Sequence, residues 1–301
     1  MLTWAAKTYG SGSLTFITSP TTAETKDLAW LESSVKVMAY SFLNVFGSPT
    51  VGAPPTGKRP IVVIYLSSHQ DNMLAVWSAL YSGFVPCLLP NLTAHLGHRK
   101  AHIEHINSLL TSDSIKPIWL THQIGSAQLD EAGATGLNIK LFDDIKKIAE
   151  TQGCPKDFNF TPADPNSDAI LFLTSGSTGF SKAVVHTHRT ILSACASKAK
   201  AFKLTPKSTT MNCKLYHNSN DQLMGLIARE GVALDHVAGS VEMHFTPLMY
   251  GCNQVHVDTA TILSDSTYFL RLIDDYVRPP TVLVWHEGSD PPAPLTCRKL
   301  P

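Results

Sequence analysis

The stretch "LFLTSGSTGFSKAVVHTHR", residues 171–189, carries the main information on the fold. It continues an apolar run typical of a buried strand, crosses a segment made almost entirely of Gly, Ser and Thr, and returns after a lysine to apolar periodicity. Such a segment is either a plain surface turn or a loop whose backbone binds a ligand. Its neighbours and the placement of the lysine favour the ligand-binding loop.

The neighbouring segments alternate between strand and helix. Apolar residues recur near helical spacing from Leu28 to Phe46, and "IVVIYL" at 61–66 is a short β-branched run typical of a buried strand. The same reasoning predicts further helices at 72–83, 98–110 and 142–151, and further strands at 84–90, 116–121 and 168–174. This alternation predicts an α/β fold with parallel-rich β-sheets flanked by helices.

In a parallel sheet, the loop that leaves the carboxyl end of a strand is where ligands bind. Gly176 and Gly179 allow the backbone to approach a ligand closely, so that successive N–H groups can converge on an anion. Hydroxyls between and beside them add donors, and Lys182 adds a mobile positive charge. The combination predicts a phosphate-binding loop.

Other glycine-rich motifs fit less well. The Walker motif needs four residues between its first glycine and a Gly-Lys pair, whereas Gly176 and Gly179 enclose two and Lys182 follows Ser181. The Rossmann fingerprint lacks its third glycine. A G-x-S-x-G elbow is excluded because Leu173 stands where its first glycine would be.

Composition limits the remaining function classes. The 301 residues are 44% hydrophobic, with 24 basic against 24 acidic residues, so we expect a globular protein with no nucleic-acid partner. The six cysteines are widely spaced, which predicts reduced thiols and a cytoplasmic protein. We expect neither a leader nor a membrane span, and residues 1–26 are expected to form a loosely structured lead-in.

Three segments together resemble the adenylate-forming (AMP-binding) superfamily of acyl-CoA synthetases, luciferases and peptide-synthetase adenylation domains. "LTSGSTGFSKAVVHTH" is similar to the signature loop of that family, with Ser181 in place of its usual proline. "SALYSGFVPCLLP" (78–90) resembles an earlier family segment, and "VALDHVAGSVEMHFTPLMYGC" (232–252) resembles the form found in fungal peptide-synthetase-like enzymes. The resemblance predicts a partial AMP-binding large domain over residues 27–277.

The resemblance implies that a carboxylic acid reacts with ATP to give an acyl-adenylate and pyrophosphate, usually followed by transfer to a thiol. Mg²⁺ would assist, and coenzyme A or the phosphopantetheine of a carrier protein would be the acceptor. It also implies a set of residues that contact phosphate: Thr174, Ser175, Gly176, Ser177, Thr178, Gly179 and Lys182. Lys182 would stabilise the charge that builds up on the leaving pyrophosphate.

Histidines supply the other candidate positions. By the same resemblance His236 lies near the carboxylate and the α-phosphate, and Gly239 follows in the wall of the substrate pocket, although His236 is also compatible with a hydrogen-bonded core position. Spacings of three and four place a second group on one helix face, without the carboxylates or cysteines that would complete a metal site: His95, His98, His102 and His105. His186 and His188 are expected to pack behind the loop.

The resemblance also implies features that are not found after residue 252: a Tyr-Gly-x-Thr-Glu motif, a ribose-binding aspartate, a hinge and a small domain with a catalytic lysine. Residues 278–301 are proline-rich and non-periodic, as an off-frame tail would be. Residues 213–231 form either a surface insertion or a translated retained intron, and we expect them to disturb the strand that presents His236. We therefore expect little or no full activity from the chain as written.

Three hypotheses remain open from the sequence. The chain is a ligase module completed by another chain, a non-functional or mispredicted gene fragment, or a P-loop-like phosphotransferase. The last requires a lysine spacing that the chain lacks.

Overall fold

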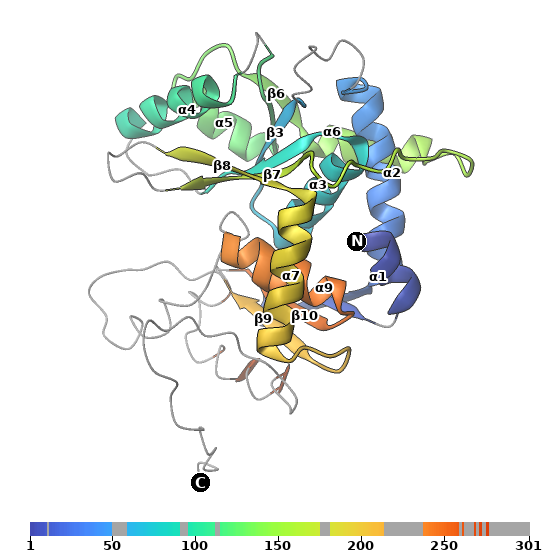
Figure 1. Ribbon diagram of the computed structural model, residues 1–301. Helices are drawn as coiled ribbons and strands as arrows, with labels where there is room; N and C mark the ends of the chain where they lie inside the picture. The colour runs from blue at the N-terminus through green and yellow to red at the C-terminus, as the bar shows by residue number, and fades with distance from the viewer. Residues whose placement is uncertain are drawn as a thin grey trace.

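The structure is a computed structural model, which describes residues 1–10, 12–49, 59–90, 96–111, 115–174, 181–213 and 237–258, with 261, 268, 271–272 and 275–276. Its strands form two sheets joined by helices (Figure 1). One sheet has six strands in the order β6-β5-β3-β4-β7-β8, and the other has four in the order β2-β1-β10-β9. The predicted α/β fold with parallel-rich sheets is confirmed.

The six-stranded sheet is parallel except at one edge, where β8 runs antiparallel to β7. The direction of the chain connections reverses at β3 and β4. The connection from β3 leads to β4 on one side of β3, and the connection from β4 crosses back to β5 on the other side of β3. Ligands of open parallel sheets bind at the carboxyl ends of the strands next to such a reversal. The strands are β3 Ile61–Tyr65, β4 Val85–Leu88, β5 Ile118–Thr121, β6 Asn138–Leu141, β7 Asp168–Thr174 and β8 Lys182–Thr187.

Helices cover both faces of this sheet. They are α2 Leu28–Phe46, α3 His69–Ser82, α4 Leu96–Leu110, α5 Gln123–Glu131, α6 Phe142–Gln152 and α7 His188–Phe202. Capping explains several of their ends: Asp27 accepts from Trp30 N at 2.6 Å where α2 begins, and Gly83 takes a φ of +86° where α3 ends. No helix among the described residues has the length and apolarity needed to cross a membrane.

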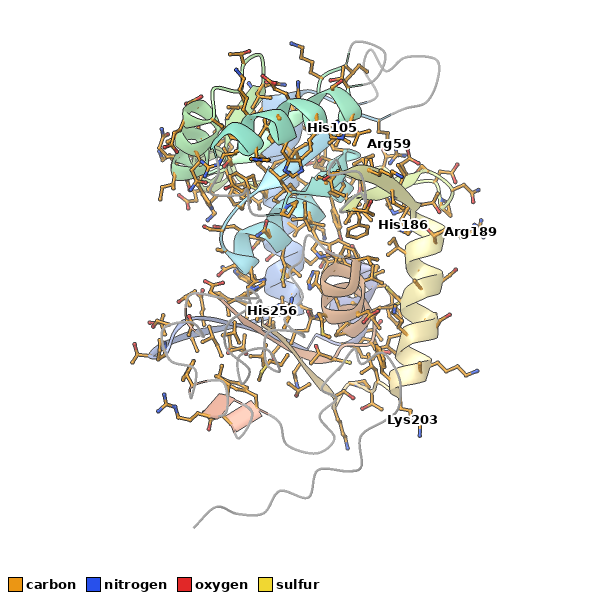
Figure 2. The ribbon with its side chains drawn as sticks, turned by 90° about the vertical axis from the view of Figure 1, so that its left-hand side faces the viewer. Arg59, His105, His186, Arg189, Lys203 and His256 are labelled. Carbon is orange, nitrogen blue, oxygen red and sulfur yellow. The ribbon has the colours of Figure 1, made fainter. Side chains whose placement is uncertain are left out.

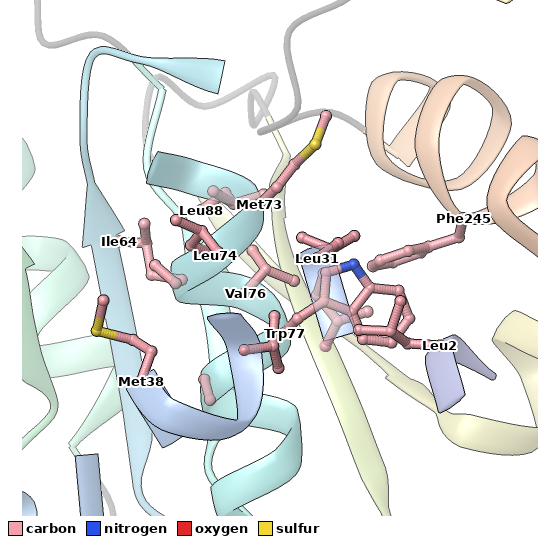
Figure 3. Packing of buried hydrophobic residues seen from close by; sticks show 14 of the residues in the cluster. Leu2, Leu31, Met38, Ile64, Met73, Leu74, Val76, Trp77, Leu88 and Phe245 are labelled. Carbon is pink, nitrogen blue, oxygen red and sulfur yellow. The ribbon is translucent and has the colours of Figure 1, made fainter. Parts of the chain in front are cut away.

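Alternating strand residues divide the core into two layers. On β3, Val62 and Ile64 face the cluster built on α2 and α3, whereas Val63 faces the cluster built on α4 and α5. In the first layer Trp77 of α3 packs between other apolar side chains and meets Phe245 edge to face at 5.2 Å (Figure 3). Apolar side chains therefore cover both faces of the six-stranded sheet. Polar chemistry is expected at the ends of its strands.

The second sheet corrects one expectation. Residues 1–26 are not a loosely structured lead-in: the chain starts with a helix and two strands, α1 Leu2–Thr8, β1 Ser13–Ser19 and β2 Thr22–Asp27. Leu14 and Phe16 are buried because β1 lies beside β10, a parallel strand more than 200 residues later. The remaining elements are β9 Thr209–Cys213, the π-helical segment η1 Ala238–Phe245, α9 Thr246–Met249 and β10 Asn253–Val257.

Candidate functional site

The two ends of the glycine-rich loop are held side by side. Thr174, the last residue of β7, is the register partner of Lys182, the first residue of β8. Thr174 Oγ1 donates to the carbonyl oxygen of Lys182 at 3.4 Å, and both residues are exposed. The strand pairing therefore brings the lysine amine and the threonine hydroxyl to the carboxyl edge of the sheet, as the sequence predicts for β7.

Two histidines of α4 hold the residue that precedes Lys182. His102 Nε2 lies 3.0 Å from Ser181 Oγ, and His105 Nε2 donates to the Ser181 carbonyl at 2.8 Å. Figure 2 labels His105 on its helix, α4. They share one helix face, as their spacing predicts. Burial lowers the pKa of His102, and the nearby His105 adds to this effect, so His102 is largely uncharged at neutral pH.

The other predicted site residues divide into two groups. Ser175, Gly176, Ser177, Thr178 and Gly179 of the loop lie outside the described residues, as do His95 and His236. Gly239 is described and is buried in the first turn of η1. Of the two histidines expected to pack behind the loop, His186 stands edge-on to Phe172 at 5.6 Å.

Behind η1 lies a buried network that the sequence did not suggest. Trp77 Nε1 donates to His244 Nε2 at 2.8 Å, which leaves the proton of His244 on Nδ1 because an indole can only donate. His244 Nδ1 then donates to Gln254 Oε1 at 2.9 Å, and His256 Nε2 donates to the same oxygen at 3.1 Å. This chain of donors fixes the tautomers of both imidazoles and the orientation of the Gln254 amide.

The network ties η1 to its surroundings. His244 and His256 are 2% and 1% exposed, and burial lowers the pKa of His244 to about 4 and that of His256 well below its usual value. Both imidazoles are therefore neutral at physiological pH. On the other side of η1, Lys198 of α7 forms an ion pair with the buried Glu242. The segment that follows His236 is thus anchored to β10, α3 and α7.

Charged groups meet at the same carboxyl edge, beyond β3 and β5. His122 Nε2 lies 3.2 Å from Asp71 Oδ2 and its Nδ1 lies 3.1 Å from Asp143 Oδ1, while Lys146 Nζ is 2.5 Å from Asp71 Oδ1. The hydrogen bond to Asp71 raises the pKa of His122. Burial alone would raise the pKa of Asp71, but hydrogen bonds from His122 and Lys146 outweigh it and lower that pKa. The cluster joins α3, α5 and α6.

The described residues do not provide a ligand set for a metal ion. Among the residues that the structure describes, no three His, Cys, Asp or Glu side chains converge on one point. The described residues at the loop ends offer a hydroxyl, an amine and imidazoles, which suit phosphate oxygens better than Mg²⁺. They do not fit a magnesium site.

Comparison with known proteins identifies the family of the chain. The profile of a family described as "AMP-binding enzyme" matches residues 58–277. In the solved structure of McyG A-PCP complexed with phenylalanyl-adenylate, the similar region has a TM-score of 0.70 at 21% identity, and the match covers 91% of this chain and 44% of that one. That likeness shows the fold.

Curated relatives add sequence similarity over a limited part of their length. Atromentin synthetase nps3 of Serpula lacrymans var. lacrymans (strain S7.9) is 42% identical over 278 residues, which are 91% of this chain and 26% of that protein. Inactive atromentin synthetase invA6 of Paxillus involutus is 40% identical over 274 residues, 90% of this chain and 25% of that protein. The chain thus spans about a quarter of the length of these relatives, and overall identity does not separate an active relative from an inactive one.

Proposed function

Because the chain belongs to the AMP-binding enzyme family, we propose that it supplies the phosphate-binding part of an adenylate-forming enzyme. The enzyme would activate a carboxylic acid with ATP, release pyrophosphate and pass the acyl group to a thiol of coenzyme A or of a carrier protein, in the cytoplasm. The observation that carries this proposal is the pairing of Thr174 with Lys182 at the carboxyl edge of the six-stranded sheet.

The roles of the residues follow from charge and position. As the acid attacks the α-phosphorus, negative charge accumulates on the departing pyrophosphate, and a fixed lysine amine stabilises that charge more than it stabilises the bound ATP. Lys182 would supply the amine, and the hydroxyls and amides from Thr174 to Gly179 would bind the other oxygens. His236 and Gly239 would line the position of the acid, and Gly239 lies in η1, which the buried His244 network holds in place.

We expect the 301-residue chain alone to show little or no full turnover. Single groups of the kind expected beyond residue 252 contribute a few kcal/mol each to transition-state stabilisation, and losing several removes most of the rate. A non-functional or mispredicted fragment is the second candidate, and the 40% identity to a relative that is named inactive supports considering it.

A chimera separates these two candidates. This chain replaces the matching segment of the Serpula lacrymans relative, and exchange of labelled pyrophosphate into ATP is measured over a panel of aryl and alkyl acids. The proposal predicts exchange by the chimera and background for the chain alone. A folded chimera without exchange, beside an active parent, would favour the non-functional fragment. Sequencing the transcript across residues 205–301 would show whether this reading frame is used.

A further inference from the structure

A cavity of about 440 Å³ lies between α3, α7, η1 and the extended segment 160–165. Ala169 and Ile170 line it at the amino end of β7, whereas Thr174 stands at the carboxyl end of that strand. At about 3.3 Å per residue, Ile170 and Thr174 are roughly 13 Å apart. The cavity is therefore separate from the proposed nucleotide site, and its size falls within the usual range for small-molecule sites.

Aromatic rings form the walls of this cavity. Trp77 and Tyr81 lie one turn apart on the same face of α3; Trp77 meets Phe245 edge to face at 5.2 Å, and Tyr81 meets Phe160 in the same way at 5.5 Å. Rings locked in such pairs present fixed flat surfaces and edges. A planar aromatic molecule suits these walls better than a flexible chain, because it makes stacked or edge contacts without losing rotational freedom.

The polar residues of the lining are Met1 with its terminal amine, Thr3, Tyr81, Thr161 and His188. Thr3 Oγ1 and Tyr81 Oη lie 2.6 Å apart and share one hydrogen bond. The His188 imidazole is half-buried, and among the described residues it has no hydrogen-bond partner. Its ring nitrogens can therefore bond to a molecule in the cavity.

His188 is uncharged near neutral pH. Burial lowers its pKa, and of the charged side chains nearby Arg59 acts in the same direction whereas Asp164 opposes it. A neutral imidazole offers one donor and one acceptor, which a hydroxyl group matches because it can accept from one and donate to the other.

The start of α7 gives a ligand no further anchor for a negative charge. His188 N donates to the Ser167 carbonyl at 3.2 Å and Arg189 N donates to the Pro165 carbonyl at 2.8 Å. Thr190 N donates to the Thr187 hydroxyl at 3.2 Å. The first amides of the helix are thus satisfied, so a carboxylate entering here would find no free backbone donors.

We propose that this cavity binds a small planar aromatic molecule that carries an uncharged hydroxyl group, with the ring against the aromatic side chains of α3 and their partners and the hydroxyl against His188. The proposal does not depend on the proposed acid activation, because the cavity is separate from the Thr174–Lys182 hairpin.

Three probes with the same ring system test the proposal on the 301-residue chain: 2-naphthol, naphthalene and 2-naphthoate, titrated by fluorescence at pH 7.5. The proposal predicts saturable binding of one 2-naphthol per chain. Naphthalene should bind about three- to tenfold more weakly because it lacks the hydroxyl. 2-Naphthoate should bind more weakly than 2-naphthol. Failure of 2-naphthol to bind, or tighter binding of 2-naphthoate, would overturn the proposal.

Variants locate the bound probe. Ala163→Trp places a large ring in the cavity from the half-exposed segment that borders it, whereas Ala127→Trp adds the same ring to the exposed face of α5. We expect 2-naphthol affinity to fall at least tenfold in the first and to stay unchanged in the second. His188→Phe should weaken 2-naphthol to the level of naphthalene and leave naphthalene unaffected. Equal affinities across all variants would place the probe elsewhere and refute the assignment. Melting curves confirm that each variant is folded.

Discussion

Thr174 and Lys182 face each other across the β7–β8 hairpin, so the first and last members of the predicted phosphate-contacting set are neighbours in space. The two residues are eight positions apart in the sequence, and strand pairing and α4 fix the described ends of the segment between them. Closure of this kind reduces the entropy that a loop loses when it binds an anion. The account therefore predicts that residues supporting the hairpin affect anion affinity without contacting the anion.

The support from α4 is tested by His105→Ala, which removes the donor to the Ser181 carbonyl. We expect the affinity for pyrophosphate, measured by calorimetry, to fall about three- to tenfold because one hydrogen bond that fixes Ser181 is lost. His98→Ala, an exposed position on the same helix, is the matched control. Equal effects of the two substitutions would argue against a positioning role for His105.

The buried network predicts a large loss of stability for Gln254→Leu. The change leaves the N–H groups of His244 and His256 without an acceptor in a dry interior. The expected cost is about 3 kcal/mol in the free energy of unfolding, measured with urea. Gln152→Leu, at an exposed position, should stay within about 0.5 kcal/mol. A mild effect of Gln254→Leu would mean that other acceptors replace the amide.

The low pKa of His244, about 4, predicts a pH dependence of stability. Between pH 6.5 and 4 the unfolded chain binds a proton at this residue and the folded chain does not, so stability falls as the pH falls. From pH 6.5 to 5 the loss due to His244 is about 1.5 kcal/mol. Burial raises the pKa of Asp258 to about 6. Protonation of Asp258 in the folded chain therefore increases stability as the pH falls, which opposes the effect of His244. His244→Phe keeps Asp258, so it should show a smaller loss on acidification than the parent; identical slopes would contradict this assignment.

The cluster around His122 predicts that Asp71→Asn lowers the free energy of unfolding more at low pH than at high pH. Asp71→Asn removes the partner of His122 and Lys146, and we expect a loss of about 1 to 2 kcal/mol at pH 6 because the groups are partly exposed. The raised pKa of His122 means that its contribution is present below the ordinary histidine value and is lost as the pH rises through the raised one. The difference from the parent should therefore shrink at pH 9. The control is Asp144→Asn on the exposed side of α6, and a difference independent of pH would show that His122 takes no part.

Local patterns predicted most of the six-stranded sheet. The helix expected from Leu28 to Phe46 and the strand expected at 168–174 have those bounds in the structure, because helical periodicity and a short apolar run depend only on neighbouring residues. The loop position after β7 could be placed for the same reason, whereas β8, the edge strand that holds Lys182, was not predicted.

What local patterns missed depends on contacts between distant segments. The strands at 13–27 carry many Ser and Thr residues, and β1 becomes a buried strand by pairing with β10. The His244 network joins α3, η1 and β10, and nothing near Trp77 in the sequence indicates its partner. The repeated alternation of polar and apolar residues in "NQVHV" at 253–257 was the available signal, since it places Gln254 and His256 on one face of a strand.

The most direct test of the central claim is the affinity of the chain for ATP, measured by calorimetry for the parent and for Lys182→Ala. Loss of a charged hydrogen bond to phosphate predicts roughly ten- to a hundredfold weaker binding, while Lys207→Ala, an exposed lysine before β9, should leave the affinity unchanged. Equal ATP affinity for Lys182→Ala and the parent, with both chains folded, would contradict the assignment of this hairpin to the phosphates.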